Sequence, residues 1–169
     1  MPRVVLDTNV LIAAAYAERS ASRRIVEAAL SDRLEAVASE AVLREYRFIV
    51  DRAVRRPDYR EQLAVLVDAV EVVEPAALPP TVPDDPDDDK LLAAAVGGLA
   101  GWLVTNDRHL LVLHPFRGIR IVTSGVFAEE VLGRLAGHPA VAARRSIRDN
   151  RPDHEPATRT SQSSLQEGR

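Results

Sequence analysis

Five short apolar runs alternate along the chain with longer stretches that have helical spacing. The runs are RVVL (3–6), EAVAS (35–39), VEVVE (70–74), WLVT (102–105) and IRIVT (119–123). Each run is short and apolar enough to form a buried strand. Strands that alternate with helices are joined by crossover connections, which favour a mostly parallel sheet covered by helices on both faces. The pattern therefore predicts a protein of the α/β class.

Capping residues predict where several of the helices begin. Ser39 suits the N-cap of a helix whose apolar face holds Val42, Tyr46 and Ile49. Further helix starts are expected at Ser20 or Ser22, at Pro57, at Asp85 with Pro86, and at Ser124. The proline-rich stretch 75–86 is expected to be a loop.

The 169 residues suggest one domain, and the hydrophobic content of 46% is enough for a buried core. After Gly137 the apolar pattern fades, so we expect a domain over 1–137 and a polar, disordered tail over 138–169. The tail could have no role, or it could dock a partner or RNA. The chain has no cysteine, which excludes disulfides and thiolate sites.

The N-terminal apolar stretch is interrupted by Asp7, Thr8 and Asn9, which argues against a signal peptide. No run approaches the roughly 18 apolar residues of a membrane span. We therefore expect a cytoplasmic protein. Its net charge of −3 excludes the globally basic surface of simple nucleic-acid binders.

Acidic residues follow two of the predicted strands. Asp7 comes directly after RVVL, and Asp107 lies two residues beyond WLVT. Ligands of open α/β sheets bind beyond the carboxyl ends of the strands, so parallel neighbours would bring both acids into one crevice. Either aspartate alone could instead be only a helix cap. A cap is a weaker explanation for two aspartates that occupy matching positions after two strands.

Two further acids lie on predicted helices. Glu45 shares a helix face with Val42 and Ile49, where it either meets the other acids or extends to solvent from the flank. In DPDDDK (85–90), the first aspartates suit the cap and first turn of a helix.

Within DPDDDK, Asp89 stands above the apolar face that continues through Ala93 and Val96, so we expect it to point towards the other acids. Asp88, four residues before Leu92, is its near rival.

The four acids Asp7, Glu45, Asp89 and Asp107 are therefore predicted to converge. Two carboxylates about 5 Å apart repel by roughly 3 kcal/mol at an effective dielectric constant of ~20, so such a cluster protonates or binds a cation. Ligand sets made only of oxygen suit Mg²⁺ or Mn²⁺. One or two such ions could activate water and stabilise the charge that develops on a phosphodiester.

These residues carry a resemblance to PIN-domain proteins over about residues 2 to 135. VVLDTNVLI resembles the family's opening, and ASEAVLREYRFIV resembles its second motif, with Glu45. DPDDDKLLAAAVGGLAGWLVTNDRHLL resembles the third and fourth motifs, and GIRIVTSGVF the closing strand and helix. The resemblance implies a three-layer α/β/α PIN-like fold with a mostly parallel central sheet.

The resemblance also implies an activity, a metal-dependent endoribonuclease that cleaves single-stranded RNA. Mg²⁺ or Mn²⁺ would be held by the four acids. The residues expected to orient these acids are Thr8, Asn9, Ser39, Thr105 and Asn106. RRPDYR and DPDDDK are similar to the bacterial subgroup of toxins from toxin–antitoxin pairs, which implies an antitoxin protein as partner and a homodimer.

One position departs from the family pattern. Many relatives carry an aspartate where this chain has His109, which puts the metal affinity in question. The arginines Arg44, Arg47, Arg52 and Arg108 are candidate phosphate contacts, or only solvated helix faces.

Two rival functions stay open. A PIN fold could bind RNA or a partner without cutting. A phosphatase of the haloacid-dehalogenase type would need a second Asp where this chain has Asn9.

Overall fold

The computed structural model describes residues 1–83 and 85–136. Its five strands form one all-parallel sheet in the order β3-β2-β1-β4-β5. The strands are β1 (Arg3–Leu6), β2 (Glu35–Ala38), β3 (Glu71–Val72), β4 (Trp102–Val104) and β5 (Arg120–Val122). Each lies within one of the five apolar runs, so the α/β class and the parallel sheet are confirmed.

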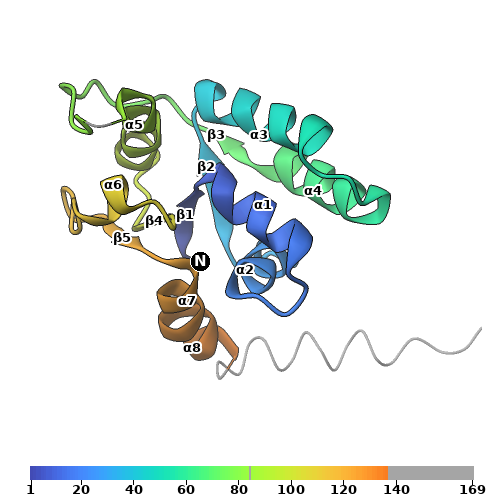
Figure 1. The fold of residues 1–169 in the computed structure, drawn as a ribbon. Coiled ribbons are helices and arrows are strands. Elements are labelled where there is room, and N and C mark those ends of the chain that lie inside the picture. The colour runs from blue at the N-terminus through green and yellow to red at the C-terminus, as the bar shows by residue number, and fades with distance from the viewer. Residues whose placement is uncertain (84, 137–169) are drawn as a thin grey trace, which may run out of the picture.

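Helices cover both faces of the sheet, which gives three α/β/α layers. Figure 1 shows α5 and α6 on one side of the strands and α1 to α4 on the other. The helical elements are α1 (Thr8–Tyr16), α2 (Ala21–Leu30), α3 (Glu40–Arg52), α4 (Pro57–Ala69), the 3-10 turn η1 (Pro86–Asp88), α5 (Asp89–Gly97), α6 (Arg108–Leu111), α7 (Ser124–Phe127), the π-helical turn η2 (Ala128–Leu132) and α8 (Gly133–Ala136).

The sheet has one topological switch point, between β1 and β4. From β1 the chain moves outward through β2 and β3, and it then returns to the other side of β1 to add β4 and β5. Val5 pairs with Leu103 and Leu6 with Val104, and all four side chains are buried. The loops that follow β1 and β4 therefore leave the sheet side by side, where α/β folds place their ligands.

Helix starts follow the capping residues closely. Ser20 caps α2 and Ser39 caps α3, each through a hydrogen bond from a backbone N–H in the first turn. The expected cap at Ser124 is wrong, because Thr123 accepts from the N–H of Val126 in that place. The hydroxyls of Ser124 and Ser22 are instead hydrogen-bonded at 3.0 Å inside the protein. The short α6 had no sequence pattern that predicted it.

The loop between β3 and α5 lies closely against that helix. A Cβ atom at Gly97 would lie 1.9 Å from the carbonyl oxygen of Glu74, so only glycine permits this approach. The N–H of Ala76 donates to the carbonyl oxygen of Ala93 at 2.9 Å. The loop therefore fixes α5 along its length.

The predicted tail over 138–169 lies outside the described residues, as does residue 137, the last of the expected domain. Within the described residues, no helix is long and apolar enough to cross a membrane.

Candidate active site

Asp7 stands at the carboxyl end of β1 and is buried, with 4% of its surface exposed. Its Oδ1 caps α1 by accepting a 3.1 Å hydrogen bond from the backbone N–H of Asn9. Its Oδ2 accepts a 2.6 Å hydrogen bond from the hydroxyl of Thr105, at the end of β4. Capping therefore accounts for one oxygen of Asp7 only, and the second oxygen is oriented by the neighbouring strand.

Asp107 is positioned by the same threonine. Its backbone N–H donates to Oγ1 of Thr105 at 2.9 Å, and its own Oδ1 caps α6 by accepting from the N–H of His109 at 2.7 Å. Thr105 is completely buried. One hydroxyl therefore ties Asp7 to Asp107 across the switch point, as the placement of both acids after parallel strands suggested.

Glu45 reaches the same edge from α3. Its Oε1 accepts a 2.8 Å hydrogen bond from the hydroxyl of Thr8, which also lies 3.3 Å from Oδ1 of Asp7. The side chain is about one-third exposed, so Glu45 stands at the rim. Next to Glu45 in the chain, Tyr46 donates its buried hydroxyl to the carbonyl oxygen of Leu6. Burial, together with the charges of Asp7 and Glu45, raises the pKa of Tyr46, so this phenol stays neutral.

Lys90 contacts Glu45 from the other side, and the sequence gave no expectation for it. Its Nζ lies 2.7 Å from Oε2 of Glu45, an ion pair rather than a well-aligned hydrogen bond. Burial lowers the pKa of Lys90, but the contact with Glu45 and the charges of Asp87 and Asp88 outweigh it, so the pKa rises overall. The sequence did offer one clue, since Lys90 is the only lysine of the chain.

Asp89 differs from its expected placement. Its carboxylate accepts hydrogen bonds from the backbone N–H groups of Thr81, at 3.0 and 3.2 Å, and of Val82, at 2.8 Å. Both oxygens are therefore directed at the loop before the helix, not at Asp7 and Asp107. Asp89 holds that loop against the first turn of α5.

Asp88, the near rival of Asp89, interacts electrostatically with the two strand-end acids. Its Oδ2 is buried and has no hydrogen-bond partner. Burial and the charges of Asp85, Asp7 and Asp107, opposed by Lys90, raise the pKa of Asp88 to about 6. Asp88 thus shares the electrostatic environment of the two strand-end acids.

A 3-10 turn explains the exchange between the two aspartates. The helical spacing assumed an α-helix from Pro86 onward, whereas Pro86–Asp88 form η1 and α5 begins only at Asp89. Asp85 caps η1 through the N–H of Asp87, as its position predicted. A 3-10 turn has 3.0 residues per turn instead of 3.6, so it rotates the side chains that precede α5 relative to its apolar face.

The other predicted residues have varied positions. Ser39 is buried and caps α3, and Oδ1 of Asn106 accepts from the N–H of Ser124 at 3.4 Å. Neither contacts a carboxylate of the site. Asn9 contacts Asp7 through its backbone, and its side chain is exposed. Arg44 is exposed on α3, the helix that carries Glu45. Arg108 is exposed on α6, the helix that follows Asp107.

The carboxylates fit a hard divalent cation by their chemistry. All donors are oxygen, and the unpartnered buried Oδ2 of Asp88 and its raised pKa mark negative charge that Lys90 compensates only in part. Among the described residues, no three His, Asp or Glu side chains already form a ready-made ligand set. Binding an ion between Asp7, Asp88 and Asp107 therefore requires side chains to rearrange.

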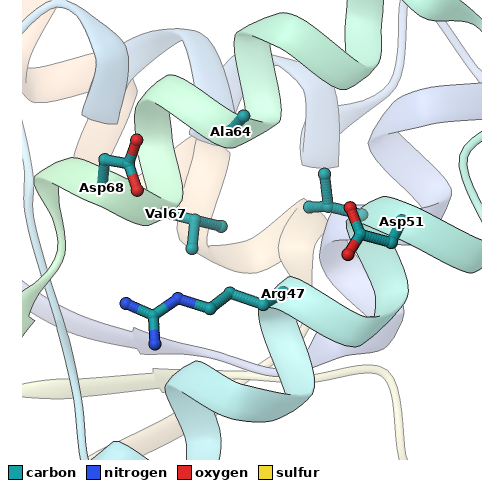
Figure 2. Close-up of a pocket in the computed structure, with 6 residues that line it drawn as sticks. Arg47, Asp51, Ala64, Val67 and Asp68 are labelled. Atoms are coloured by element: carbon teal, nitrogen blue, oxygen red, sulfur yellow. The ribbon is translucent and has the colours of Figure 1, made fainter.

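A pocket between α3 and α4 is separate from this site. It is lined by Arg47, Val50, Asp51, Ala64, Val67 and Asp68 (Figure 2). Its α3 residues lie two, five and six positions after Glu45, which places them on the opposite side of the helix from that acid. The pocket and the carboxylates therefore do not share a ligand.

Comparison with protein families agrees with this arrangement. The PIN domain model matches residues 3–109, which include β1 to β4 and all the acids described above. The match ends before β5, so the resemblance of GIRIVTSGVF is not part of it. A search of curated proteins found no match. With the five-stranded parallel sheet and the acids at its switch point, the match shows that this chain belongs to the PIN domain family.

Proposed function

We propose that this protein is a metal-dependent endoribonuclease that cleaves single-stranded RNA. PIN domains are generally nucleases that use divalent metals. The observation that carries the proposal is the buried, unpartnered Oδ2 of Asp88 near the charges of Asp7 and Asp107; burial first, and then the charges of Asp85, Asp7 and Asp107, raise the pKa of Asp88 to about 6. A divalent cation relieves the repulsion among these acids and binds phosphate, and no helix-cap hydrogen bond accounts for the unpartnered Oδ2 of Asp88.

In this proposal Asp7, Asp88 and Asp107 hold the ion, and Asp88 replaces Asp89 in the expected set. A divalent ion at such a site supplies activation of water and stabilisation of charge on the phosphodiester. Thr105 fixes the carboxylate of Asp7 relative to the backbone of Asp107. Asp89 anchors the loop that positions Asp88, and so acts on the site through structure.

Exposed residues on the outer surface of α3 support the choice of a single-stranded substrate. Phe48 lies three residues after Glu45, and Arg52 lies four residues after Phe48, so the three share one helix face. Phe48 is 56% exposed, and the Arg52 guanidinium lies 5.3 Å from the centre of its ring. Exposed aromatic rings stack on unpaired bases, and arginines pair with phosphates. Arg44 and Arg108 are further candidate phosphate contacts at the rim of the site.

The finer assignment is a toxin of a toxin–antitoxin pair, acting in the cytoplasm as a homodimer. The similarity of RRPDYR and DPDDDK to the toxin subgroup supports it. Expression of the chain alone should arrest growth, and co-expression of the product of an adjacent small reading frame should relieve the arrest. Growth that is unaffected by an active nuclease would contradict the toxin role while leaving the nuclease assignment intact.

The deciding experiment is cleavage of a mixed-sequence single-stranded RNA by the purified full chain, with Mg²⁺, with Mn²⁺ and with EDTA. Asp7→Asn and Asp107→Asn should each lower the rate at least about 100-fold, since both remove proposed ligands. Asp68→Asn, at an exposed position on α4, is the matched control and should be as active as the wild type.

The same experiment distinguishes the rivals. Cleavage that persists in EDTA and in both strand-end variants would overturn the proposal. A folded wild type that binds the RNA but cuts it with neither metal would point to the binding module, and release of phosphate from monoesters alone would point to the phosphatase.

A further inference from the structure

Lys90 is the unexplained residue of the site. It is the only lysine of the chain and follows a run of aspartates, yet its ammonium contacts Glu45 on a different helix. The approach of 2.7 Å crosses from the first turn of α5 to the middle of α3. A surface ion pair of two long side chains contributes little to stability, so stability alone is a weak reason for this arrangement.

Each carboxylate oxygen of Glu45 has a partner. Oε1 accepts from the hydroxyl of Thr8 at 2.8 Å, and Oε2 faces the Lys90 ammonium. The Thr8 hydroxyl has a single hydrogen and lies nearer to Glu45 than to Asp7, at 2.8 against 3.3 Å. Each oxygen of Glu45 keeps a second lone pair, but a metal ion bound there would lie beside the positively charged Lys90 ammonium.

The distribution of charge also separates Glu45 from the other acids of the site. Four carboxylates without a nearby cation would favour two divalent ions, as in two-metal nuclease sites. Lys90 compensates Glu45, and the remaining acids Asp7, Asp88 and Asp107 suffice for one ion. A second ion beside Glu45 would also lie against the ammonium, which repels it.

We propose that Lys90 is a built-in cation that takes the position of a second metal beside Glu45, so that the site binds a single divalent ion. The inference rests on the proposed function, because it concerns the same carboxylates. It assigns Glu45 to positioning and not to direct ligation.

The test is the number of Mn²⁺ ions bound per chain, measured on the full-length protein by the electron paramagnetic resonance of free Mn²⁺ during a titration. The wild type and Lys90→Arg should bind one ion. Lys90→Met, which keeps the length of the side chain and removes its charge, should bind a second. Arg47→Met removes another ion pair of α3, with Glu40, and is the matched control that should still bind one.

Affinities from the same titration test the role of Glu45. Glu45→Gln should leave the affinity for the single ion unchanged, whereas Asp107→Asn should weaken it at least about tenfold. Two ions in the wild type, no second ion in Lys90→Met, or an equal loss of affinity in Glu45→Gln and Asp107→Asn would each overturn the role of Lys90. These outcomes leave the nuclease assignment standing, whereas a wild type that binds no Mn²⁺ overturns both.

Discussion

Thr105 donates a 2.6 Å hydrogen bond to Oδ2 of Asp7, although 98 residues separate them in the chain. The same hydroxyl accepts from the backbone N–H of Asp107, so one buried side chain sets the relative position of the two strand-end acids. The link exists because β4 lies next to β1 in the sheet.

Replacing Thr105 with valine should disrupt this link without changing the side-chain shape. Oδ2 of Asp7 and the N–H of Asp107 would both lose a partner, which should lower the free energy of unfolding by about 1–3 kcal/mol. Affinity for Mn²⁺ should fall by roughly 10- to 100-fold, as for other residues that orient metal ligands. Thr105→Ser keeps the hydroxyl and should retain most of the stability and most of the affinity for Mn²⁺. Equal affinities in the valine and serine variants would contradict the orienting role.

The two adjacent aspartates of the α5 start should have opposite effects. Asp89→Ala removes the acceptors for Thr81 and Val82, so it should lower the free energy of unfolding by about 1–3 kcal/mol. Asp88→Ala removes repelled charge and should not destabilise the metal-free protein. Cleavage should be lost in Asp88→Ala and largely retained in Asp89→Ala under conditions where that variant is folded.

Urea unfolding and RNA cleavage, measured on both variants, check this prediction. Loss of cleavage in Asp89→Ala together with normal cleavage in Asp88→Ala would return the ligand role to Asp89.

The stability of the metal-free protein should depend on the ionisation of Asp88. Its pKa is about 6 in the fold and 3.8 ordinarily. Between these values the unfolded chain has released the proton and the folded chain retains it, so the free energy of unfolding falls as the pH rises from about 4 to about 6. Because the side chain is partly exposed, screening should limit the loss to about 1 kcal/mol.

The measurement is urea unfolding of the wild type and Asp88→Asn in EDTA across this pH range. The stability of the wild type relative to the variant should decline with rising pH and recover when Mn²⁺ is added. A difference in stability between the wild type and Asp88→Asn that does not change with pH would contradict the raised pKa of Asp88.

Phe48 should matter for RNA and not for stability. Truncation of an aromatic side chain that stacks on a base costs about 1–3 kcal/mol of binding, so Phe48→Ala should weaken RNA binding about five-fold or more. The ring is 56% exposed, so folding should change little. Val65→Ala, at a similarly exposed position on α4, is the control. Binding of fluorescent RNA in Ca²⁺, which should not support cleavage, gives the affinities; equal values for both variants would place the strand elsewhere.

Much of the fold was predictable because it depends on local patterns. Apolar runs located all five strands, and Ser20 and Ser39 located two helix starts, since a cap acts within one turn of its own helix. The alternation of strands and helices predicted the parallel sheet, because crossover connections leave few other arrangements. The placement of Asp7 and Asp107 followed from that sheet, as Asp7 directly follows β1 and Asp107 comes three residues after the end of the neighbouring β4.

The sequence by itself therefore determined the strands, the class of fold and the strand-end acids of this PIN domain. Only the tertiary structure decided which aspartate of DPDDDK faces them and which cation accompanies Glu45. The first choice depends on a 3-10 turn and on loop N–H groups that Asp89 must satisfy, and the second on the approach of α5 to α3. Neither can be read from spacing along the chain, because each is set by contacts between segments that meet only when the sheet has formed.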